Sequence, residues 1–362
     1  MKLYFVAGEA SGDARGAELL RALRAREPEL EFFGAGGREM QALAGGDFLD
    51  WADEAVVGLW DVLKKYGYFK RQFDQMLADI ERVSPDAVVL IDYPGFNLRL
   101  AKELRARGTR TKIIYYISPQ VWAWNRGRIP KMARWLDLML CIFPFEQPLY
   151  EKSGLKTIFV GHPMIDSYAP KKTGAPREPN LIGLFPGSRE KEVRKIFPVM
   201  LASAKLLAAS DPELRFEAAA ASPALETLMR AQAGDFPCII TLRTSHALMQ
   251  RAAAGLVASG TATLEAAYFG MPLAILYKVA WLTWVVGKRL VRVPFLGMPN
   301  ILAGREIARE FLQEAAEPKA IAAEVRRLLR EPNSAELAEV TAKLGGGGAA
   351  ERAAEAILGA LR

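Results

Sequence analysis

Short apolar runs alternate with longer amphipathic segments from Met1 to about Asp166. This alternation is typical of buried parallel strands, each followed by a helix that covers one face of the sheet. The first half of the chain therefore predicts a parallel, doubly wound sheet, with strands at Lys2–Ala7, Ala87–Asp92, Lys112–Ile117, Leu138–Phe143 and Thr157–Gly161.

The pattern then breaks and starts again. Residues Tyr168–Asn180 are rich in Pro, Lys and Gly, which is typical of a surface linker. Beyond this linker the alternation returns, and from Glu306 onward we expect helices alone. The apolar runs of the second half predict strands at Leu181–Phe185, Arg215–Ala219, Cys238–Leu242, Gly255–Ala258 and Leu273–Tyr277.

These patterns predict an α/β protein with two Rossmann-like domains that face each other across a cleft. We expect the domains at residues 1–168 and 169–345, and a C-terminal helix over residues 346–362 that packs back on the first domain. Glycosyltransferases of the B-type fold, oxidoreductases and epimerases share this architecture, so chemistry has to be read from individual sites.

The clearest site lies in Leu184–Leu207, where an apolar run meets Pro186, Gly187 and Ser188 and a charged amphipathic segment follows. This is the pattern of strand, tight turn and helix, with Ser188 placed to cap the helix. Arg189 then stands beside free backbone N–H groups at the positive end of a helix dipole, a combination that suits a diphosphate. The alternative is an ordinary turn with an Arg that faces solvent.

A second turn of this kind lies in Ala254–Pro272, where a strand ends in Ser259, Gly260 and Thr261 and a helix begins. Glu265 lies on the first turns of that helix, where its carboxylate can accept both hydroxyls of a ribose. Two anion-binding turns in one half of the chain predict a nucleotide diphosphate at the carboxyl ends of the strands.

The first strand is followed by Gly8–Asp13, GEASGD, which matches neither the dinucleotide fingerprint nor the P-loop. We expect it to line the cleft, with Ser11 as a hydrogen-bond donor and Gly12 allowing close approach of a substrate. The alternative is a glycine turn in which Asp13 caps the helix.

Ile91–Asn97, IDYPGFN, places Asp92 at the end of a buried strand. A carboxylate partly shielded from water there is a suitable general base for a sugar hydroxyl, although it can also merely cap the turn. Asn97 is expected to cap a helix over Leu98–Arg107.

Ser118–Arg128 holds Trp122 and Trp124 close to two arginines, a set that stacks on a sugar or, as in most proteins, packs in the core. His162 lies at a strand end and is expected to be structural, whereas His246 has no partner in sequence. Asp and Glu clusters with metal spacing are absent from the sequence, so no metal is expected.

Composition narrows the class further. The chain has 362 residues, a net charge of +7 and 51% hydrophobic residues, with a pI of about 9.3 and a mean hydropathy of +0.05. Its two cysteines lie in apolar strand patterns, which argues against a disulfide framework. Because the sequence shows neither a signal peptide nor an apolar stretch of about 20 residues, we expect a cytoplasmic protein. A net positive charge is compatible with phosphorylated substrates or with an anionic membrane face. Nucleic acid is the least favoured partner, since the sequence contains no nucleic-acid-binding motif.

Taken together, GEASGD, IDYPGFN, YYISPQVWAWNRGR, FPFE, GHP, LFPGSREKEV, SGTATLEAAYFGMP, KRLV and MPNILAGREIAREFLQ resemble the lipid-A-disaccharide synthase family. They occur in the family's order from about Gly8 to Gln313. The resemblance implies the B-type glycosyltransferase fold. It also implies an inverting reaction that joins UDP-2,3-diacylglucosamine to 2,3-diacylglucosamine 1-phosphate, releases UDP and needs no cofactor or metal.

The resemblance also assigns roles. UDP is expected on the second domain, held by Gly187, Ser188, Arg189, Glu265 and Asn300, with Arg189 stabilising the leaving diphosphate. The acceptor is expected on the first domain, at Glu9, Ser11, Gly12, Asp13 and Trp124, with Asp92 as base.

One departure from the family pattern bears on the base. Some relatives carry a second acid where this chain has Gly95, and if that acid is their base, Glu9 or Asp13 is the next candidate here. The runner-up function is another UDP-sugar enzyme of this fold, a 2-epimerase or a transferase to a different lipid. A protein that only senses nucleotide is the non-enzymatic alternative.

Ala55–Arg71 predicts a contact with the membrane. Its apolar residues recur at helical spacing, four basic residues follow, and aromatic residues suit headgroup depth. We expect this segment to lie on the cytoplasmic face of the inner membrane and to admit the acyl chains. The alternative is a helix whose apolar stripe packs on the sheet; that stripe is Val56, Leu59, Trp60 and Leu63.

Overall fold

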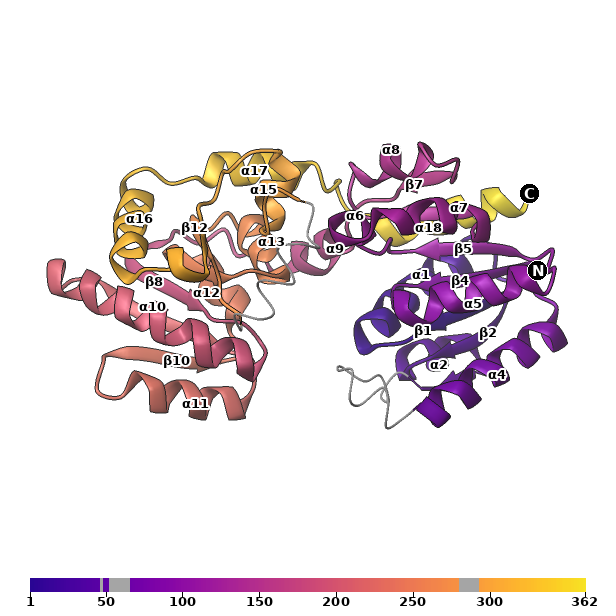
Figure 1. Ribbon diagram of the computed structural model, residues 1–362, viewed down its shortest axis with the longest axis horizontal. Helices are drawn as coiled ribbons and strands as arrows, with labels where there is room; N and C mark the ends of the chain where they lie inside the picture. The colour runs from indigo at the N-terminus through magenta and orange to yellow at the C-terminus, as the bar shows by residue number, and fades with distance from the viewer. Residues whose placement is uncertain (46–47, 52–65, 280–292) are drawn as a thin grey trace. The chain divides into compact units, whose positions relative to one another are not determined.

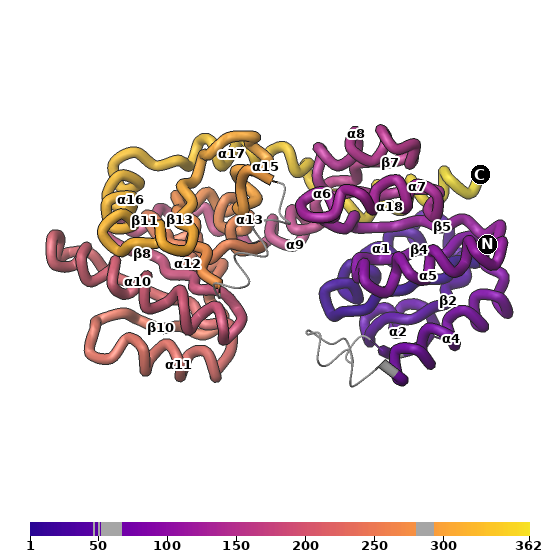
Figure 2. Tube along the Cα trace, viewed as in Figure 1, coloured from indigo at the N-terminus to yellow at the C-terminus, as the bar shows by residue number. Residues whose placement is uncertain are grey.

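The computed structural model describes residues 1–45, 48–51, 66–279 and 293–362. The chain divides into two compact units (Figures 1 and 2). The N-terminal unit comprises Met1–Asp166 and Leu344–Arg362, and the C-terminal unit comprises Ser167–Lys343. The predicted membrane stripe of Val56, Leu59, Trp60 and Leu63 lies outside the described residues.

The described part of the N-terminal unit contains a parallel sheet of seven strands in the order β3-β2-β1-β4-β5-β6-β7. The order reverses between β1 and β4, which are hydrogen-bonded neighbours. The strands are β1 (Lys2–Ala7), β2 (Glu31–Gly36), β3 (Phe48–Asp50), β4 (Ala87–Ile91), β5 (Lys112–Tyr116), β6 (Leu138–Cys141) and β7 (Thr157–Phe159).

Helices cover this sheet and enclose two hydrophobic clusters. One cluster joins α1, α2 and α18 to the strands, and the other joins α4, α5 and α7 to them. The alternating strand residues Leu3 and Phe5 face the first cluster, while Tyr4 and Val6 face the second. The helices of this unit are α1 (Ala10–Arg26), α2 (Arg38–Ala44), α4 (Tyr66–Val83), α5 (Pro94–Ala106), α6 (Val121–Trp124), η2 (Arg126–Arg128), α7 (Ile129–Trp135), α8 (Glu146–Glu151) and α18 (Ala349–Leu361).

The C-terminal helix α18 packs on α1 and buries Ala353, Ala354 and Ile357 in the first cluster. Asp166 fixes its start, because the Asp166 carboxylate accepts the backbone N–H groups of Gly348 and Ala349 at 2.7 and 3.1 Å. The last residues of the chain thus complete the core of the unit that begins it.

The C-terminal unit repeats the architecture, with six parallel strands in the described residues in the order β10-β9-β8-β11-β12-β13. Here the order reverses between β8 and β11. Together the two units confirm the predicted fold class of two Rossmann-like α/β domains. The strands are β8 (Glu178–Phe185), β9 (Arg215–Ala220), β10 (Cys238–Leu242), β11 (Ala252–Ala258), β12 (Leu273–Tyr277) and β13 (Glu310–Leu312).

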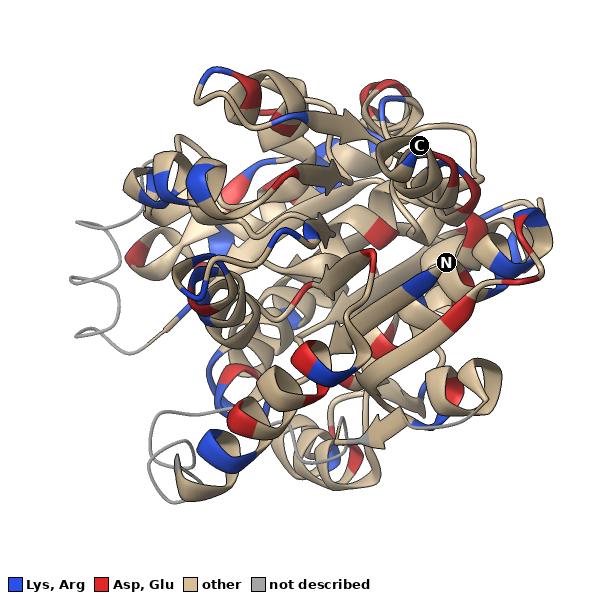
Figure 3. Ribbon diagram, turned by 90° about the vertical axis from the view of Figure 1, so that its right-hand side faces the viewer, with Lys and Arg blue, Asp and Glu red and all other residues tan. Residues whose placement is uncertain are grey.

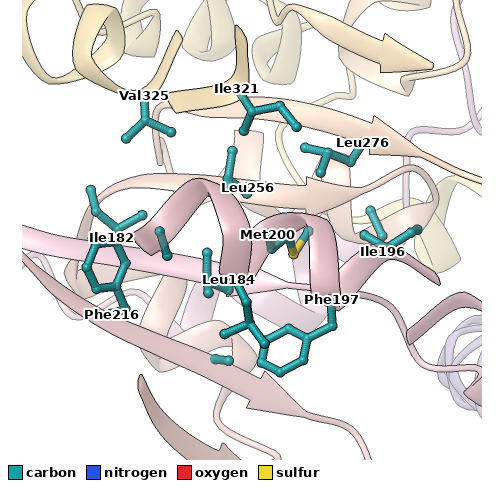
Figure 4. Packing of buried hydrophobic residues seen from close by; sticks show 14 of the residues in the cluster. Ile182, Leu184, Ile196, Phe197, Met200, Phe216, Leu256, Leu276, Ile321 and Val325 are labelled. Carbon is teal, nitrogen blue, oxygen red and sulfur yellow. The ribbon is translucent and has the colours of Figure 1, made fainter. Parts of the chain in front are cut away.

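The core of this unit forms where α10 and α16 lie on the sheet (Figure 4). Ile196, Phe197 and Met200 of α10 meet Leu184 and Leu256 of the two central strands. The helical segments are α9 (Met164–Tyr168), which crosses from one unit to the other, η3 (Ala169–Lys171), α10 (Glu190–Ser210), α11 (Pro223–Ala233), α12 (Ser245–Arg251), α13 (Thr261–Tyr268), α15 (Met298–Ala303), η4 (Gln313–Ala315), α16 (Pro318–Arg330) and α17 (Ser334–Ala342).

One prediction about the C-terminal region is wrong. We expected helices alone from Glu306 onward, but Glu310–Leu312 forms β13 and pairs with β12. Acidic and basic residues are interspersed along the ribbon in this view and do not form one block of either sign (Figure 3). No helix within the described ranges has the length and apolar character that a bilayer crossing requires.

Candidate active site

In each sheet the strand order reverses at one point. The turns that follow the two strands at this point contain the polar residues that the sequence predicts for the sites. In open α/β sheets, ligands bind outside the carboxyl ends of the strands at such a point. In the N-terminal unit these turns follow β1 and β4 and contain Glu9 and Asp92. In the C-terminal unit they follow β8 and β11 and contain Gly187 and Gly260.

The turn after β4 holds Asp92 in a strained conformation. Asp92 and Tyr93 have φ angles of 46° and 48°, so two successive residues with side chains adopt the left-handed region. Each such residue costs on the order of 1–3 kcal/mol and persists only where the surroundings fix it.

Three hydrogen bonds fix this turn through the backbone of Asp92. Its N–H donates to the Tyr116 carbonyl at 2.9 Å, and its carbonyl accepts the Asn97 amide at 2.8 Å and the Tyr115 hydroxyl. Asn97 is fully buried inside α5, which begins at Pro94. The prediction that Asn97 caps a helix is therefore wrong, because its side chain holds the turn that precedes the helix.

Glu9 and Ser11 lie at the start of α1, after β1. Glu9 is half-buried and Ser11 is exposed. The close approach in this motif occurs at Gly8, because a Cβ there would lie 2.3 Å from the Tyr93 ring. A Cβ on Gly12 would meet only Ala7 and Ile91 at ordinary contact distances of 3.6 Å or more.

Asp13 has a different task from the one we predicted. It is 6% exposed, and its two carboxylate oxygens accept the backbone N–H groups of Gly37, Glu39 and Met40 at 2.8–3.1 Å. These are the unsatisfied donors at the start of α2. Asp13 thus caps α2 rather than its own helix, and its geometry does not support a role as base or acceptor contact.

The carboxyl group of Asp92 has an altered acidity. Burial raises its pKa above the ordinary value, a hydrogen bond from the Tyr93 backbone lowers it in part, and the negative charge of Glu9 raises it further. The charge of Glu9, at the end of β1, therefore makes Asp92, at the end of the neighbouring strand β4, harder to ionise.

A cavity of about 400 Å³ opens at the strand ends of the C-terminal unit. It brings together every UDP-binding residue that the sequence predicts except Asn300. It also includes Ser245 of α12, which sequence reasoning missed because that strand end shows no glycine-rich turn. The predicted residues among its lining are Gly187, Ser188, Arg189, Ser259, Gly260, Thr261 and Glu265.

Helix N-termini and the guanidinium of Arg189 give this cavity its anion-binding character. The turn passes Gly187 at a φ of 108°, a conformation that favours glycine. Arg189, not Ser188, is the residue at the helix start, and no side chain caps α10, so the predicted Ser188 cap is wrong. The Arg189 side chain is 72% exposed and pairs with Glu192 at 3.1 Å.

Two residues far away in sequence hold the carboxylate of Glu265. The Tyr168 hydroxyl donates to one oxygen at 3.1 Å, and Nε2 of His246 lies 3.3 Å from the other. The rings of Tyr168 and His246 also contact each other and Phe269. The sequence shows no partner for His246, because Glu265 lies 19 residues further along the chain, and Tyr168 lies 97 residues before Glu265. Neither pair forms a local pattern.

Asn300 lies outside this cavity. It is fully buried, and its amide uses all four hydrogen-bonding positions: it donates to Ala308 and Glu310 and accepts the N–H groups of Ile307 and Ala308. The geometry does not support the predicted contact with UDP, because Asn300 shapes the loop before β13.

The tryptophan motif divides into two roles. Trp122 is buried and donates to the fully buried Glu146 at 2.8 Å, whereas Trp124 is 47% exposed, with the Arg128 guanidinium 5.3 Å from its ring. His162 accepts the Met164 N–H, and burial together with the charge of Arg15 lowers its pKa to about 4, so it is neutral at pH 7.

The two Rossmann-like units define the class of the B-type glycosyltransferase fold. Solved structures share it: an S. aureus MnaA–UDP co-structure has a TM-score of 0.67 at 14% identity and covers 99% of this chain and 96% of its own. Acinetobacter baumannii MurG has a TM-score of 0.54 at 12% identity, with 99% of both chains covered.

The family follows from sequence. Residues 3–353 match the family model described as lipid-A-disaccharide synthetase. The lipid-A-disaccharide synthase of Trichlorobacter lovleyi is 43% identical over 99% of this chain and 97% of its own length. That of Geobacter sulfurreducens is 41% identical over 99% and 96%. The chain belongs to the lipid-A-disaccharide synthase family and is a glycosyltransferase, which confirms the resemblance.

The two glycines of the first motif offer a matched test. Gly8→Ala should displace the Tyr93 ring and the adjacent Asp92. We expect kcat to fall by about 10–100-fold, the scale for a ~1 Å displacement of the group that we predict to be the base. Gly12→Ala should keep kcat and raise the unfolding free energy by roughly 0.5–1 kcal/mol. Steady-state rates and thermal melts check both. Loss of turnover in a well-folded Gly12→Ala protein would instead show that Gly12 faces substrate.

Tyr168 provides a test of the Glu265 carboxylate. Tyr168→Phe removes one hydrogen bond of about 1 kcal/mol, so UDP affinity measured by calorimetry should fall by about fivefold. The same variant should bind 2′,3′-dideoxy-UDP as the wild type does, because that nucleotide lacks the hydroxyls Glu265 is expected to accept. An equal loss for both nucleotides would place Glu265 away from the ribose.

Proposed function

We propose that this chain transfers the diacylglucosaminyl group of UDP-2,3-diacylglucosamine to the 6-hydroxyl of 2,3-diacylglucosamine 1-phosphate. The products are a β-1,6-linked disaccharide 1-phosphate and UDP. Family membership supports a UDP-sugar donor and a lipid acceptor. The cavity in the C-terminal unit supports the donor half of the proposal, since two turns and Arg189 converge on it.

In this proposal, Asp92 takes the proton from the acceptor hydroxyl. The freed oxygen attacks the anomeric carbon from the face opposite UDP, so the C–O bond to the diphosphate breaks and the configuration inverts. Arg189 and the N-terminus of α10 stabilise the negative charge that develops on the leaving diphosphate. Glu265 accepts the ribose hydroxyls and so orients the nucleotide.

The strained turn at Asp92 is the observation that carries the catalytic assignment. A buried hydrogen-bond network keeps a carboxylate at the strand end in a conformation that an ordinary turn would avoid. Its raised pKa keeps the group a stronger base than an ordinary aspartate.

Mass spectrometry tests the whole reaction. The protein is incubated with the acylated UDP-sugar and the lipid monosaccharide phosphate, and the disaccharide 1-phosphate is expected together with UDP. Formation of a 2-epimer of the UDP-sugar without acceptor would establish an epimerase instead. UDP binding with no product of either kind would leave only a nucleotide sensor.

The pH dependence of kcat/KM tests the base. Asp92 acts in its ionised form, and its pKa is raised, so the acid limb of the profile should lie above the ordinary range of an aspartate. Removing the neighbouring charge with Glu9→Gln should lower that pKa and move the limb to lower pH. Asp92→Asn should lower kcat by about 10²–10⁴-fold with UDP affinity unchanged. If Glu9→Gln abolishes turnover as Asp92→Asn is expected to, Glu9 is the base.

We also propose that the protein acts on the cytoplasmic face of the inner membrane. The proposal depends on the sequence pattern of residues 55–71, whose apolar stripe is flanked by basic and aromatic residues. Leu59→Ser combined with Trp60→Ser should abolish flotation with anionic liposomes while the melting temperature is kept. A melting temperature many degrees lower would show that the stripe belongs to the core.

A further inference from the structure

The N-terminal unit has a cavity of its own, and its lining includes Tyr93, the residue that follows Asp92. This cavity has no role in the proton transfer proposed for Asp92. Its volume is about 330 Å³, within the ~300–1,000 Å³ range of small-molecule sites. Among the described residues, four aromatic rings and two cations line it; these lining residues are Phe69, Lys70, Phe73, Tyr93, Gly95, Phe96 and Arg99.

We propose that this cavity, hereafter the aromatic pocket, takes one acyl chain of the acceptor lipid. The inference rests on the proposed function and identifies where that substrate's apolar part is held. The described walls come from α4, α5 and Tyr93 in the turn before α5, and none of the described lining residues is acidic. A straight hydrocarbon chain fits such a lining, since it offers no polar group that needs a partner.

Trp51 packs against three of the aromatic rings that line the pocket and holds them in place. It is 2% exposed, its indole N–H donates to the Ala7 carbonyl at 2.7 Å, and its ring contacts those of Phe69, Tyr93 and Phe96 at centroid distances of 6.4, 5.9 and 4.7 Å. Phe73 packs edge-on against Phe96 at 5.5 Å. The rings are thus fixed before a ligand arrives, which reduces the entropy lost on binding.

The position of the aromatic pocket next to Asp92 indicates that it binds the acceptor rather than the donor. Tyr93 forms part of its wall and directly follows Asp92, the proposed base for the acceptor hydroxyl. The nucleotide cavity belongs to the other unit. An acyl chain that starts at the sugar next to Asp92 therefore meets the aromatic pocket first.

The two cations match the remaining part of that substrate. Lys70 and Arg99 are exposed, and among the described residues neither forms an ion pair. An apolar pocket with two cations in its lining suits an amphiphile with an anionic head, such as an acylated sugar phosphate.

A glycine allows the pocket to be filled without disturbing the core. Gly95 lies in α5, is exposed, and has no atom within 4 Å of an added Cβ. Gly95→Leu should fold, since leucine favours a helix more than glycine does, and should occupy the space where the chain lies. Gly359 in α18 is helical, exposed and equally uncrowded, so Gly359→Leu is the matched control.

The experiment measures KM for a series of acceptors whose acyl chains run from acetyl to myristoyl, at saturating UDP-sugar and below the micelle concentration. In the wild type and in Gly359→Leu, KM should fall by about fourfold for each added methylene until the pocket is full, the factor that corresponds to burying one CH₂. Gly95→Leu should flatten this series and raise KM for the myristoyl acceptor by about tenfold or more, the loss of roughly two buried methylenes.

Two readouts should stay unchanged in Gly95→Leu: kcat/KM on the acetylated acceptor and UDP affinity by calorimetry. An equal loss on short and long chains would overturn the proposal, because it would place the effect at the Asp92 turn. A series as steep as that of Gly359→Leu would also overturn it. If the wild type forms no disaccharide from any acceptor, the proposed function itself fails.

Arg99→Gln tests the anionic head separately. It should raise KM for the acceptor 1-phosphate by about fivefold or more while leaving KM for the same acceptor without phosphate unchanged, since a hydrogen bond to a charged group contributes roughly 1.5–3 kcal/mol, at least about tenfold when fully formed. An equal change for both acceptors would remove the phosphate contact from the proposal.

Discussion

The backbone of the N-terminal unit turns at Asp92 and Tyr93 against its own steric preference, and much of the local architecture exists to keep it there. Asn97 and Tyr115 bind the Asp92 carbonyl, and Tyr116 binds its N–H. The Tyr93 ring lies over Gly8, where no larger residue fits. One strained turn thus positions the proposed base, selects a glycine in another motif and supplies one wall of the aromatic pocket.

Much of the fold could be predicted from the alternation of apolar runs. Lys2–Ala7 and Leu273–Tyr277 were predicted to the residue, because nearly fully buried parallel strands are continuous apolar segments. Cys238–Leu242 was also predicted to the residue, although it is an edge strand in which only Ile240 is buried. The strands that were missed lack that signal. β2 contains two glycines, and β3 and β13 have three residues each, so their pairing partners rather than their own sequences make them strands.

The candidate site also has a part that local sequence patterns predict and a part that they do not. The turns after β8 and β11 were predictable because glycine, small polar residues and a helix start are adjacent in sequence. The tasks of Asp13, Asn97 and Asn300 were not, because a polar side chain near a turn looks alike whether it faces a ligand or a buried N–H group. The pair formed by Tyr168 and Glu265 depends on contacts across 97 residues, which no local pattern encodes.

The return of α18 to the N-terminal unit has a consequence for synthesis. α1 is covered by residues 349–361, which leave the ribosome only after the entire C-terminal unit. The first sheet is complete once β7 has been made, and at about 5–20 residues per second residues 160–348 then take on the order of 9–38 s. Throughout that time one face of this sheet has an uncovered apolar patch. The C-terminal unit can therefore complete its core first, and the N-terminal unit closes only once residues 349–361 have been made.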